Sequence, residues 1–504
     1  MTTSAMLDIP GSLVLLEKTE IAKLRKTFFP PLILLTCLNG VCPQGPSQKA
    51  SDSPRNPNQS PREMFHTLVN KLAQICDFQP GGDTVTAVAV IRLDGRICYV
   101  LASNRRSTAA LSKACAGLAA VLDILKSNLE VETRDSDEMV EKRLMQKILD
   151  LNTVRVGSYL TSLSKNLQMC LTKCDDNTPE GRAAKEALEK LSRTIPDSNK
   201  DDEKSDNYIN ATMQCIMTIQ ENRKSPSQRY IEERAVEDYN MGKGGCWSSL
   251  QHVTGRLLSY KYAVQTIVHA HYIWANTDLF REFDIASVRS SQSYPTEALK
   301  FNPETAEAII NRAPGHEQAR IQVYKEHAAS LQPYGLNVHL EEKLQQKLEP
   351  IVHAEMLLHE WLSRTEGGTQ PYRFFQNWQY IGSSKPVCRL CMDYFNVIAT
   401  PVSFRSEHPN TYLNWRLPDM YVNSLEDEAS VERERKAWRA TLGQMKRRVY
   451  AAIVRVLEEK VSEKKSHDSN TYTERITTVK DVDNLANWLE GVQLRGGPSK
   501  QGAT

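Results

Sequence analysis

Apolar residues recur at helical spacing over most of this chain, and strand-like patterns occupy two shorter regions. Residues 65–76 place apolar side chains three and four positions apart, which predicts an amphipathic helix. Two runs rich in β-branched residues follow, TVTAVAVIR (84–92) and ICYVLA (97–102), with Asp94-Gly95 between them. Because Gly tolerates the positive φ that a tight turn requires, these runs predict a β-hairpin.

The pattern from about residue 107 to 347 is helical. Asn302 and Pro303 form a good helix start, since Asn caps a helix and Pro fits its first position. Polar stretches near 174–206 and 221–245 are expected to separate the helices, and no fixed repeat period indicates a solenoid. The predicted helices cover 109–125, 138–149, 253–274 and 303–311.

Strand-like patterns return in Arg373–Ile381 (RFFQNWQYI) and Val402–Phe404. After residue 425 the chain is helical again and carries an apolar stripe with alternating steps of four and three. We expect this stripe to pack onto the protein's own core rather than to form a coiled coil. Its members are Trp438, Leu442, Met445, Val449, Ala452 and Val456.

Composition sets the predicted domain boundaries. Residues 44–62 contain no aromatic or branched aliphatic side chain and cannot bury enough apolar surface to offset their ordering entropy, so they form a predicted disordered linker. The most apolar run, Phe28–Leu38, contains Pro30-Pro31 and is too short to span a membrane, which predicts a buried segment. The full division is an N-terminal segment (1–43), the linker (44–62), the first part of a core (63–130), a helical insertion (131–345), the second part of the core (346–424), a C-terminal helical region (425–495) and a disordered tail (496–504).

Charge and cysteine content narrow the possible partners and compartments. The net charge of the 504 residues is +2, so no global field favours nucleic acid, although a local basic pocket stays possible. Eleven irregularly spaced cysteines indicate a reducing compartment, and the N-terminus lacks the pattern of a secretory signal. We therefore expect an intracellular protein, cytoplasmic or nuclear, with no membrane-spanning segment. The oligomeric state is left open.

One group of residues stands out as metal-competent: His353-Ala354-Glu355 followed by Cys388-Arg389-Leu390-Cys391. Cys388 and Cys391 are three positions apart and share one face if a helix begins there. A helix N-terminus favours thiolates, and His353 lies near the start of a second predicted helix. Two helix N-termini meeting at one ion is the predicted geometry, with three protein ligands and an open fourth position typical of a catalytic zinc site.

The order helix, hairpin, His-Ala-Glu helix, strand and Cys-x-x-Cys helix resembles the cytidine-deaminase-like superfamily. More narrowly, YIGSSKPVCRLC (380–391) with NWRLPD (414–419) is similar to a deaminase-like family best represented in fungi. The resemblance covers about 65–130 and 345–420. It implies an α/β fold, a cytidine-deaminase-like α/β/α sandwich, with a large all-helical insertion and C-terminal helices.

The resemblance also implies roles for individual residues. His353, Cys388 and Cys391 match Zn²⁺ ligands, and Glu355 matches the proton shuttle for a zinc-bound water that attacks a nucleobase, nucleoside, nucleotide or related amidine. Asn104 matches a position that often contacts the substrate. One departure is that Val387 separates Pro386 from Cys388, where many relatives read Pro-Cys-x-x-Cys.

Several alternatives remain beside this interpretation. The fold could be a catalytically inactive, zinc-stabilised binding or scaffold protein, or a structural zinc module of a nucleic-acid binder. Cys-x-x-Cys could also be a redox pair, or His359 could complete a closed Cys₂His₂ site. Asn104 could instead cap the helix that starts near Ser107.

Other conspicuous residues have simpler explanations. His269 and His271 are two apart on a predicted helix, so their side chains diverge and core packing is favoured over metal binding. The basic cluster 446–448 lies among glutamates and predicts a solvated face. Four aromatic residues could stack a base, but strand or core packing is favoured for each. They are Trp378, Tyr380, Tyr412 and Trp415.

Overall fold

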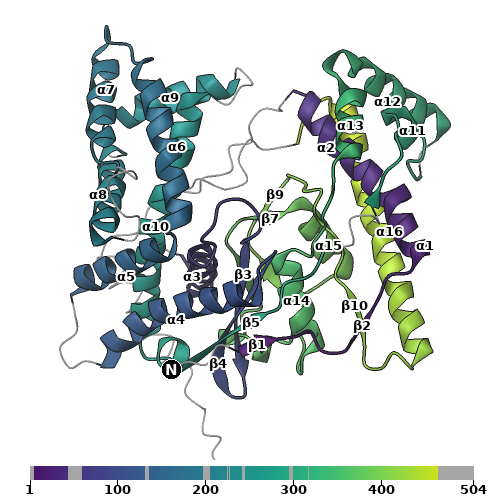
Figure 1. Cartoon of the computed structure of the whole chain (residues 1–504), viewed down its shortest axis with the longest axis horizontal. Helices are drawn as coiled ribbons and strands as arrows, with labels where there is room; N and C mark the ends of the chain where they lie inside the picture. The colour runs from purple at the N-terminus through teal and green to yellow at the C-terminus, as the bar shows by residue number, and fades with distance from the viewer. Residues whose placement is uncertain are drawn as a thin grey trace, which may run out of the picture.

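A six-stranded mixed sheet forms the centre of the protein in a computed structural model (Figure 1). The structure describes residues 5–43, 59–130, 136–196, 205–223, 225, 227–240, 245–293, 299–315 and 317–463. The strand order is β1-β5-β4-β3-β6-β8. The strands are β1 (Ala5–Leu7), β3 (Thr86–Leu93), β4 (Arg96–Ser103), β5 (Phe283–Val288), β6 (Tyr380–Ser383) and β8 (Ser403–Phe404).

The predicted hairpin is confirmed as β3 and β4, which pair antiparallel with Leu93 opposite Arg96. Asp94 and Gly95 form its turn with φ of 50° and 79°. Positive φ at both central positions matches the right-handed twist of the two strands, and this is why an Asp-Gly pair suits the turn. The turn therefore fixes the register of the two central strands.

Side chains on β3 alternate between two separate hydrophobic clusters. Ala87 and Ala89 belong to the cluster on one face of the sheet, whereas Val88 and Val90 belong to the cluster on the other. Helices α14 (Ala354–Arg364) and α15 (Arg389–Ile398) contribute to the first cluster, and α3 (Pro61–Ile75) and α4 (Thr108–Glu130) to the second. Because both faces are covered by helices, the chain has a three-layer α/β architecture.

The region 131–345 is not the single all-helical insertion that was predicted. Strand β5 lies within it and pairs parallel with β4, so this region contributes to the central sheet. The sequence FDIASV was overlooked because one short run of six residues has little periodicity to distinguish a strand from a buried helix. Tertiary pairing with β4 decides its conformation.

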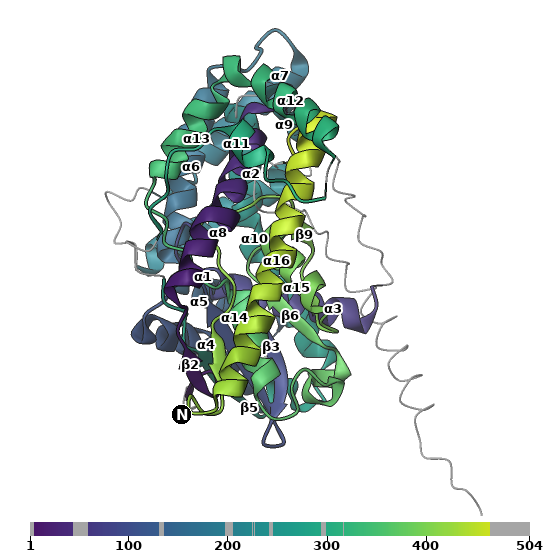
Figure 2. The ribbon, with the colours of Figure 1, turned by 90° about the vertical axis from the view of Figure 1, so that its right-hand side faces the viewer.

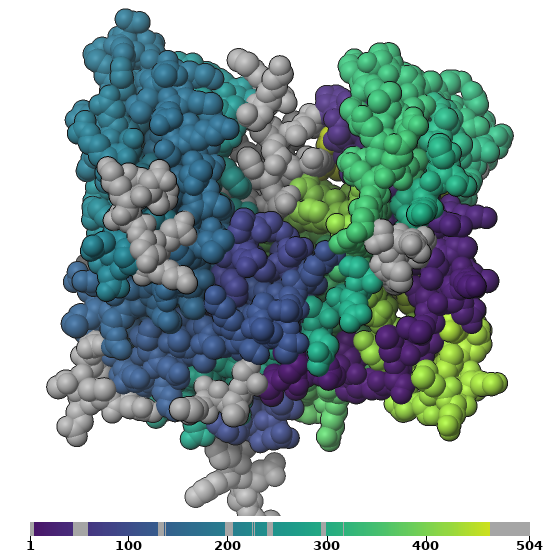
Figure 3. All heavy atoms as spheres, viewed as in Figure 1, coloured from purple at the N-terminus to yellow at the C-terminus, as the bar shows by residue number. Residues whose placement is uncertain are grey.

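Strand β5 divides the helices of this region into two groups. Helices before β5 pack on the second cluster, and helices after it pack on the first. Figures 1 and 3 show the two groups as separate masses on opposite sides of the molecule. The first group comprises α5 (Asp137–Leu151), α6 (Thr153–Leu171), α7 (Pro179–Ser192), α8 (Asp206–Asn222), α9 (Ser227–Asn240) and α10 (Cys246–Ile273); the second comprises α11 (Ala306–Ile310), α12 (Gln318–Ser330) and α13 (Leu336–Gln345).

Several local predictions were wrong. Helices α7 and α9 occupy the stretches 174–206 and 221–245 that were expected to separate helices. Helix α11 starts after Thr305, whose side chain caps it, rather than at Asn302. The segment 373–381 is mainly two short 3-10 turns, because Gln376 and Asn377 take φ of 52° and 60° and so break an extended strand. The 3-10 segments are η2 (Asp278–Phe280), η4 (Gln332–Tyr334), η5 (Pro371–Arg373) and η6 (Phe375–Asn377).

The two ends of the described chain pack together. Strand β2 (Ser12–Val14) pairs antiparallel with β10 (Met420–Val422), and α2 (Phe29–Val41) lies against α16 (Glu428–Glu459), as Figure 2 shows. Helix α2 follows α1 (Lys18–Lys23) and the π-helical segment Leu24–Phe28. The predicted buried segment and the predicted apolar stripe on α16 are both confirmed as core.

The predicted disordered segments fall mainly outside the described residues, namely 44–58 of the linker and all of the tail. The linker does end earlier than predicted, because Pro61 and Arg62 belong to α3, which Ser60 caps. Among the described helices, Thr108–Leu129 is long and apolar enough to cross a membrane by length and composition. Its buried side belongs to the second cluster, so it gives no indication of a membrane protein.

Candidate metal centre

His353, Cys388 and Cys391 meet at one point although 35 residues separate the first two. His353 Nδ1 lies 3.5 Å from Cys388 Sγ and 3.3 Å from Cys391 Sγ, and the two sulfurs are 3.4 Å apart. Within the described ranges, this is the one group of three such side chains whose ligand atoms lie close enough to share an ion. The predicted convergence of these residues is confirmed as geometry.

Two helix N-termini create this convergence. His353 is the N-cap of α14 and Cys388 is the N-cap of α15, and both have extended backbone angles. The N-terminal ends of both helix dipoles therefore point at the same place and favour negative charge on the sulfurs. Cys388 is held by the short strand β7 (Val387–Cys388), which pairs parallel with β9 (Glu407–His408).

The donor set fits a tetrahedral zinc ion. Zn–S and Zn–N bonds of ordinary length place tetrahedral ligand atoms about 3.5–3.8 Å apart. The three separations of 3.3–3.5 Å are slightly shorter than this, so little outward movement of the ligands would seat the ion. One nitrogen and two sulfurs also suit zinc chemically, and three ligands leave a fourth position for a reactant.

The charges at the cluster support ionisation of a thiol. Burial would raise the pKa of Cys388, but hydrogen bonds from Cys391 and the charge of His353 lower it well below its usual value. Burial would lower the pKa of His353, and the neighbouring Cys388 thiolate reverses this and raises it. His353 itself is partly exposed. Deprotonated thiolates are the form that binds metal.

Glu355 lies in the first turn of α14, two residues beyond His353, and is 3 % exposed. Burial raises the pKa of its carboxyl group. Ser383, the last residue of β6, donates its hydroxyl hydrogen to Glu355 Oε1 at 2.7 Å. The carboxylate is therefore positioned beside the three ligand atoms by a side chain from the sheet.

Asn104 directly follows β4 and supports the N-terminus of α14. Its Oδ1 accepts a hydrogen bond from the Ala354 backbone N–H at 2.8 Å, and its Nδ2 donates to Gly82 O at 2.9 Å. It does not cap the helix that follows it, because Ser107 Oγ accepts from Ala110 N there. Asn104 thus satisfies an otherwise free donor at the N-terminus of α14.

Trp415 is a second supporting residue and is fully buried. Burial raises the pKa of the Cys391 thiol, and the nearby indole of Trp415 opposes this rise. The indole N–H makes no hydrogen bond to a described residue. Its backbone forms a parallel bridge with Ile351, two residues before His353. Packing was expected for Trp415, but its position beside the sulfur was not.

Sequence reasoning also missed Ser383. The only available signal was its place in YIGSSKPVC, between a predicted strand and the Cys-x-x-Cys motif. Strand pairing of β6 with β3 orients the Ser383 side chain, and this pairing joins segments almost 300 residues apart. Local sequence patterns do not reveal such a contact.

Val387 is accommodated by the strand that precedes the first cysteine. Its side chain is fully buried, and its backbone N–H donates to Ser406 O at 3.2 Å. The residue between Pro386 and Cys388 therefore extends β7, and its amide is used in pairing with the 406–408 segment. This amide does not face the His/Cys/Cys group as a free donor.

Other candidate residues lie elsewhere. His359 Nε2 is 2.7 Å from Thr400 Oγ1 and its Nδ1 is 3.4 Å from Ser363 Oγ, so His359 does not join the cluster. His271 is buried in the core, with its Nε2 3.1 Å from Leu125 O, as expected for a packing residue.

Of the four aromatic residues for which packing was expected, Tyr412 is the exception. Tyr380 stacks on His66, and Trp378 packs against Phe65. Tyr412 is partly exposed, and its ring centroid lies 6.2 Å from that of His353. Among the four candidates for stacking a planar ligand, Tyr412 is thus the one that borders the imidazole.

The geometry can be compared with known families. A family model described as "OTT_1508_deam:-like deaminase" matches residues 352–419. The matched family is one of deaminases. The matched residues contain the His/Cys/Cys group, Glu355, Ser383 and Trp415. No curated protein and no solved structure matches the chain.

Proposed function

We propose that this protein is a zinc-dependent hydrolytic deaminase of a nucleobase, nucleoside, nucleotide or related amidine. The observation that carries the proposal is the juxtaposition of His353, Cys388 and Cys391 with the buried carboxylate of Glu355 at two helix N-termini. This arrangement lies inside the segment that matches a deaminase family. It supplies both a three-ligand metal site and a proton-transfer group.

His353 Nδ1 and the two sulfurs would hold the ion, which would supply an activated water as the nucleophile. Glu355 would accept one proton of this water and deliver it to the ring nitrogen, and would then pass the second proton, from the added hydroxyl, to the leaving amine. Ser383 occupies Oε1, so we assign the proton transfers to Oε2. A carboxyl group whose pKa is raised by burial is better matched to accepting and returning protons near neutral pH.

Asn104 and Trp415 would act as positioning residues. Asn104 holds the first amide of α14, and Trp415 lies beside Cys391. Such contacts orient metal ligands and are expected to influence metal affinity rather than the proton transfer itself. A direct contact of Asn104 with the substrate would require its amide to exchange a partner, since Oδ1 and Nδ2 each bond to the backbone.

Metal analysis and an ammonia-release screen test the proposal together. Purified protein should contain about one zinc per chain, as a single three-ligand site requires. The screen should cover free bases, nucleosides, nucleotides and single-stranded nucleic acids. Glu355→Gln should keep the zinc and lose about 10²–10⁴-fold in turnover.

Glu341→Gln on the exposed face of α13 is the matched control and should leave turnover unchanged. Full turnover by Glu355→Gln on an identified substrate would contradict the role of Glu355. Zinc-loaded protein that releases ammonia from no member of the panel would instead favour the zinc-stabilised scaffold.

A further inference from the structure

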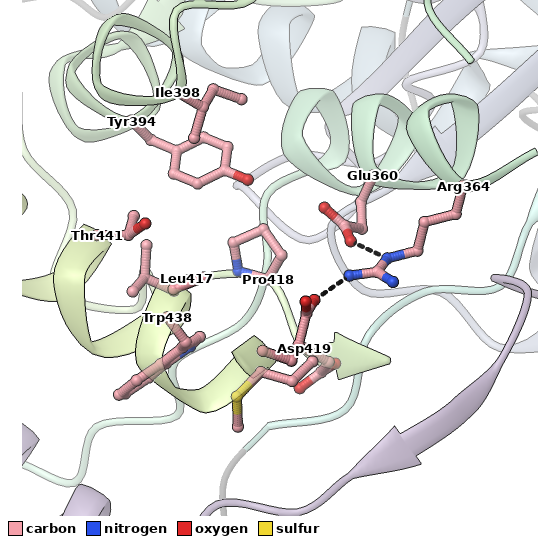
Figure 4. A pocket seen from close by; sticks show the side chains of 12 residues that line it. Glu360, Arg364, Tyr394, Ile398, Leu417, Pro418, Asp419, Trp438 and Thr441 are labelled. Atoms are coloured by element: carbon pink, nitrogen blue, oxygen red, sulfur yellow. Dashed lines mark hydrogen bonds and ion pairs between the residues drawn. The ribbon is translucent and has the colours of Figure 1, made fainter. Parts of the chain in front are cut away.

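A second concave site lies between the C-terminal halves of α14 and α15, the segment 417–420 and helix α16. It is a cavity of about 110 Å³ (Figure 4). Helices α14 and α15 carry the metal ligands at their N-terminal ends and line this cavity further along, with Glu360 and Tyr394. The cavity is therefore separate from the metal cluster, although it shares two helices with it.

Arg364 is the cation that lines this cavity, and its donors are already engaged. Its guanidinium forms ion pairs with Glu360 and Glu434, and its Nη1 donates to Tyr421 O at 2.9 Å. The same group lies over the Tyr421 ring, 5.5 Å from the centroid. A guanidinium committed in this way offers little to an incoming anion.

Tyr394 places a polar group in the cavity. The residue is 6 % exposed, and its hydroxyl has no hydrogen-bond partner among the described residues. Figure 4 shows this hydroxyl pointing into the pocket toward Glu360, whose carboxylate bonds to Arg364. A hydroxyl that faces the cavity can accept a hydrogen bond from a ligand that supplies a donor.

The charges around the cavity leave one negative charge unmatched. Glu360, Glu434 and Asp419 line it, against Arg364 within the lining and Arg416 behind it, which binds Asp419 through both carboxylate oxygens. Three carboxylates and two guanidinium groups leave a net charge of −1. The remaining wall is apolar and includes Leu417, Pro418 and Trp438.

We propose that this cavity binds a small primary amine in its ammonium form, with a short apolar group against the apolar wall. The ammonium N–H groups would donate to the Tyr394 hydroxyl and to the Glu360 carboxylate. A cation is favoured because attraction between opposite charges is stronger in a partly desolvated site than in water. An ammonium group with three donors also matches a site that presents acceptors.

Calorimetry on the full-length, zinc-loaded protein tests this proposal with three probes. The first is n-butylamine, which is an ammonium ion at neutral pH. The others are n-butanol, its neutral counterpart, and butyrate, an anion. Butylamine should bind at millimolar concentration, and the other two should not. Tyr394→Phe should weaken butylamine binding about tenfold, because a hydrogen bond to a charged group is lost. Glu360→Gln should weaken it at least as much.

Tyr334→Phe, on an exposed tyrosine, is the matched control and should bind butylamine as the wild type does. Equal binding of butanol, no binding of butylamine, or unchanged binding by Tyr394→Phe would each overturn the proposal. Tyr394→Phe retains the ring and its packing, so it separates lost recognition from lost folding. Butylamine binding should persist in Glu355→Gln, so this site can be tested whether or not the protein proves to be a deaminase.

Discussion

The hydroxyl of Ser383 donates to Glu355 Oε1 at 2.7 Å, which links the end of a central strand to the first turn of α14. Both residues are almost completely buried. This hydrogen bond favours the charged carboxylate and opposes the effect of burial on its pKa. It therefore controls both the orientation and the protonation of the group to which we assign proton transfer.

Ser383→Ala should lower kcat/KM about tenfold without changing the zinc content, because a hydrogen bond to a charged group is lost. The hydrogen bond lowers the pKa of Glu355, so its removal raises this pKa and moves the acidic limb of the pH–rate profile to higher pH. Measuring the profile on an identified substrate checks this. Ser403→Ala on β8 is the control, and an unshifted acidic limb in Ser383→Ala would contradict the assignment.

Asn104→Ala should destabilise the protein by about 1–2 kcal/mol and also weaken zinc binding, because the first amide of α14 loses its acceptor beside His353. Denaturant unfolding and zinc competition titrations measure the two effects. Thr178→Ala removes a comparable cap from α7, remote from the metal ligands, and should affect stability alone. Equal zinc affinities in the two variants would show that Asn104 does not position the site.

Arg155→Met should destabilise the protein by about 3–5 kcal/mol, since it leaves the buried carboxylate of Asp77 without its cation. Arg155 comes from α6, and Asp77 also accepts hydrogen bonds from Thr84 and Ser384. Arg155→Met/Asp77→Asn should recover part of the loss. Chemical denaturation measures the free energy of unfolding. The control is Arg229→Ala, which removes the exposed ion pair with Glu233 and should lower this free energy by less than about 0.5 kcal/mol.

His359→Gln should reduce the acid sensitivity of folding. Burial lowers the pKa of His359 to about 4, so between pH 6.5 and 4 the unfolded chain binds a proton that the folded chain does not. Stability is consequently lost as pH falls through this window, by up to about 3 kcal/mol from this group. The unfolding free energies of variant and wild type are compared at pH 7 and pH 5. Because both proteins contain the same potential metal ligands, the difference between them excludes the contribution of these residues. An equal loss of stability between pH 7 and pH 5 in the two proteins would contradict the prediction.

Patterns within single segments were sufficient for several features. The hairpin followed from two β-branched runs around Asp94-Gly95, and the buried stripe on α16 followed from its spacing. The three potential metal ligands were identified from residue type and from the expected helix starts at His353 and Cys388. These features depend on local backbone preferences and side-chain chemistry, which a sequence expresses directly.

Other features depend on which segments meet in space. Strand β5 became a strand through pairing with β4, and this divided the helical region between the two faces of the sheet. Ser383 contacts Glu355, Asn104 contacts the first amide of α14, and Trp415 lies beside Cys391, each from a distant segment. The second cavity needs four segments to enclose it. The sequence by itself thus determined the chemistry available at His353, Glu355, Cys388 and Cys391. Only the tertiary structure decided what surrounds them, because packing and hydrogen bonding between remote segments leave no local pattern along the chain.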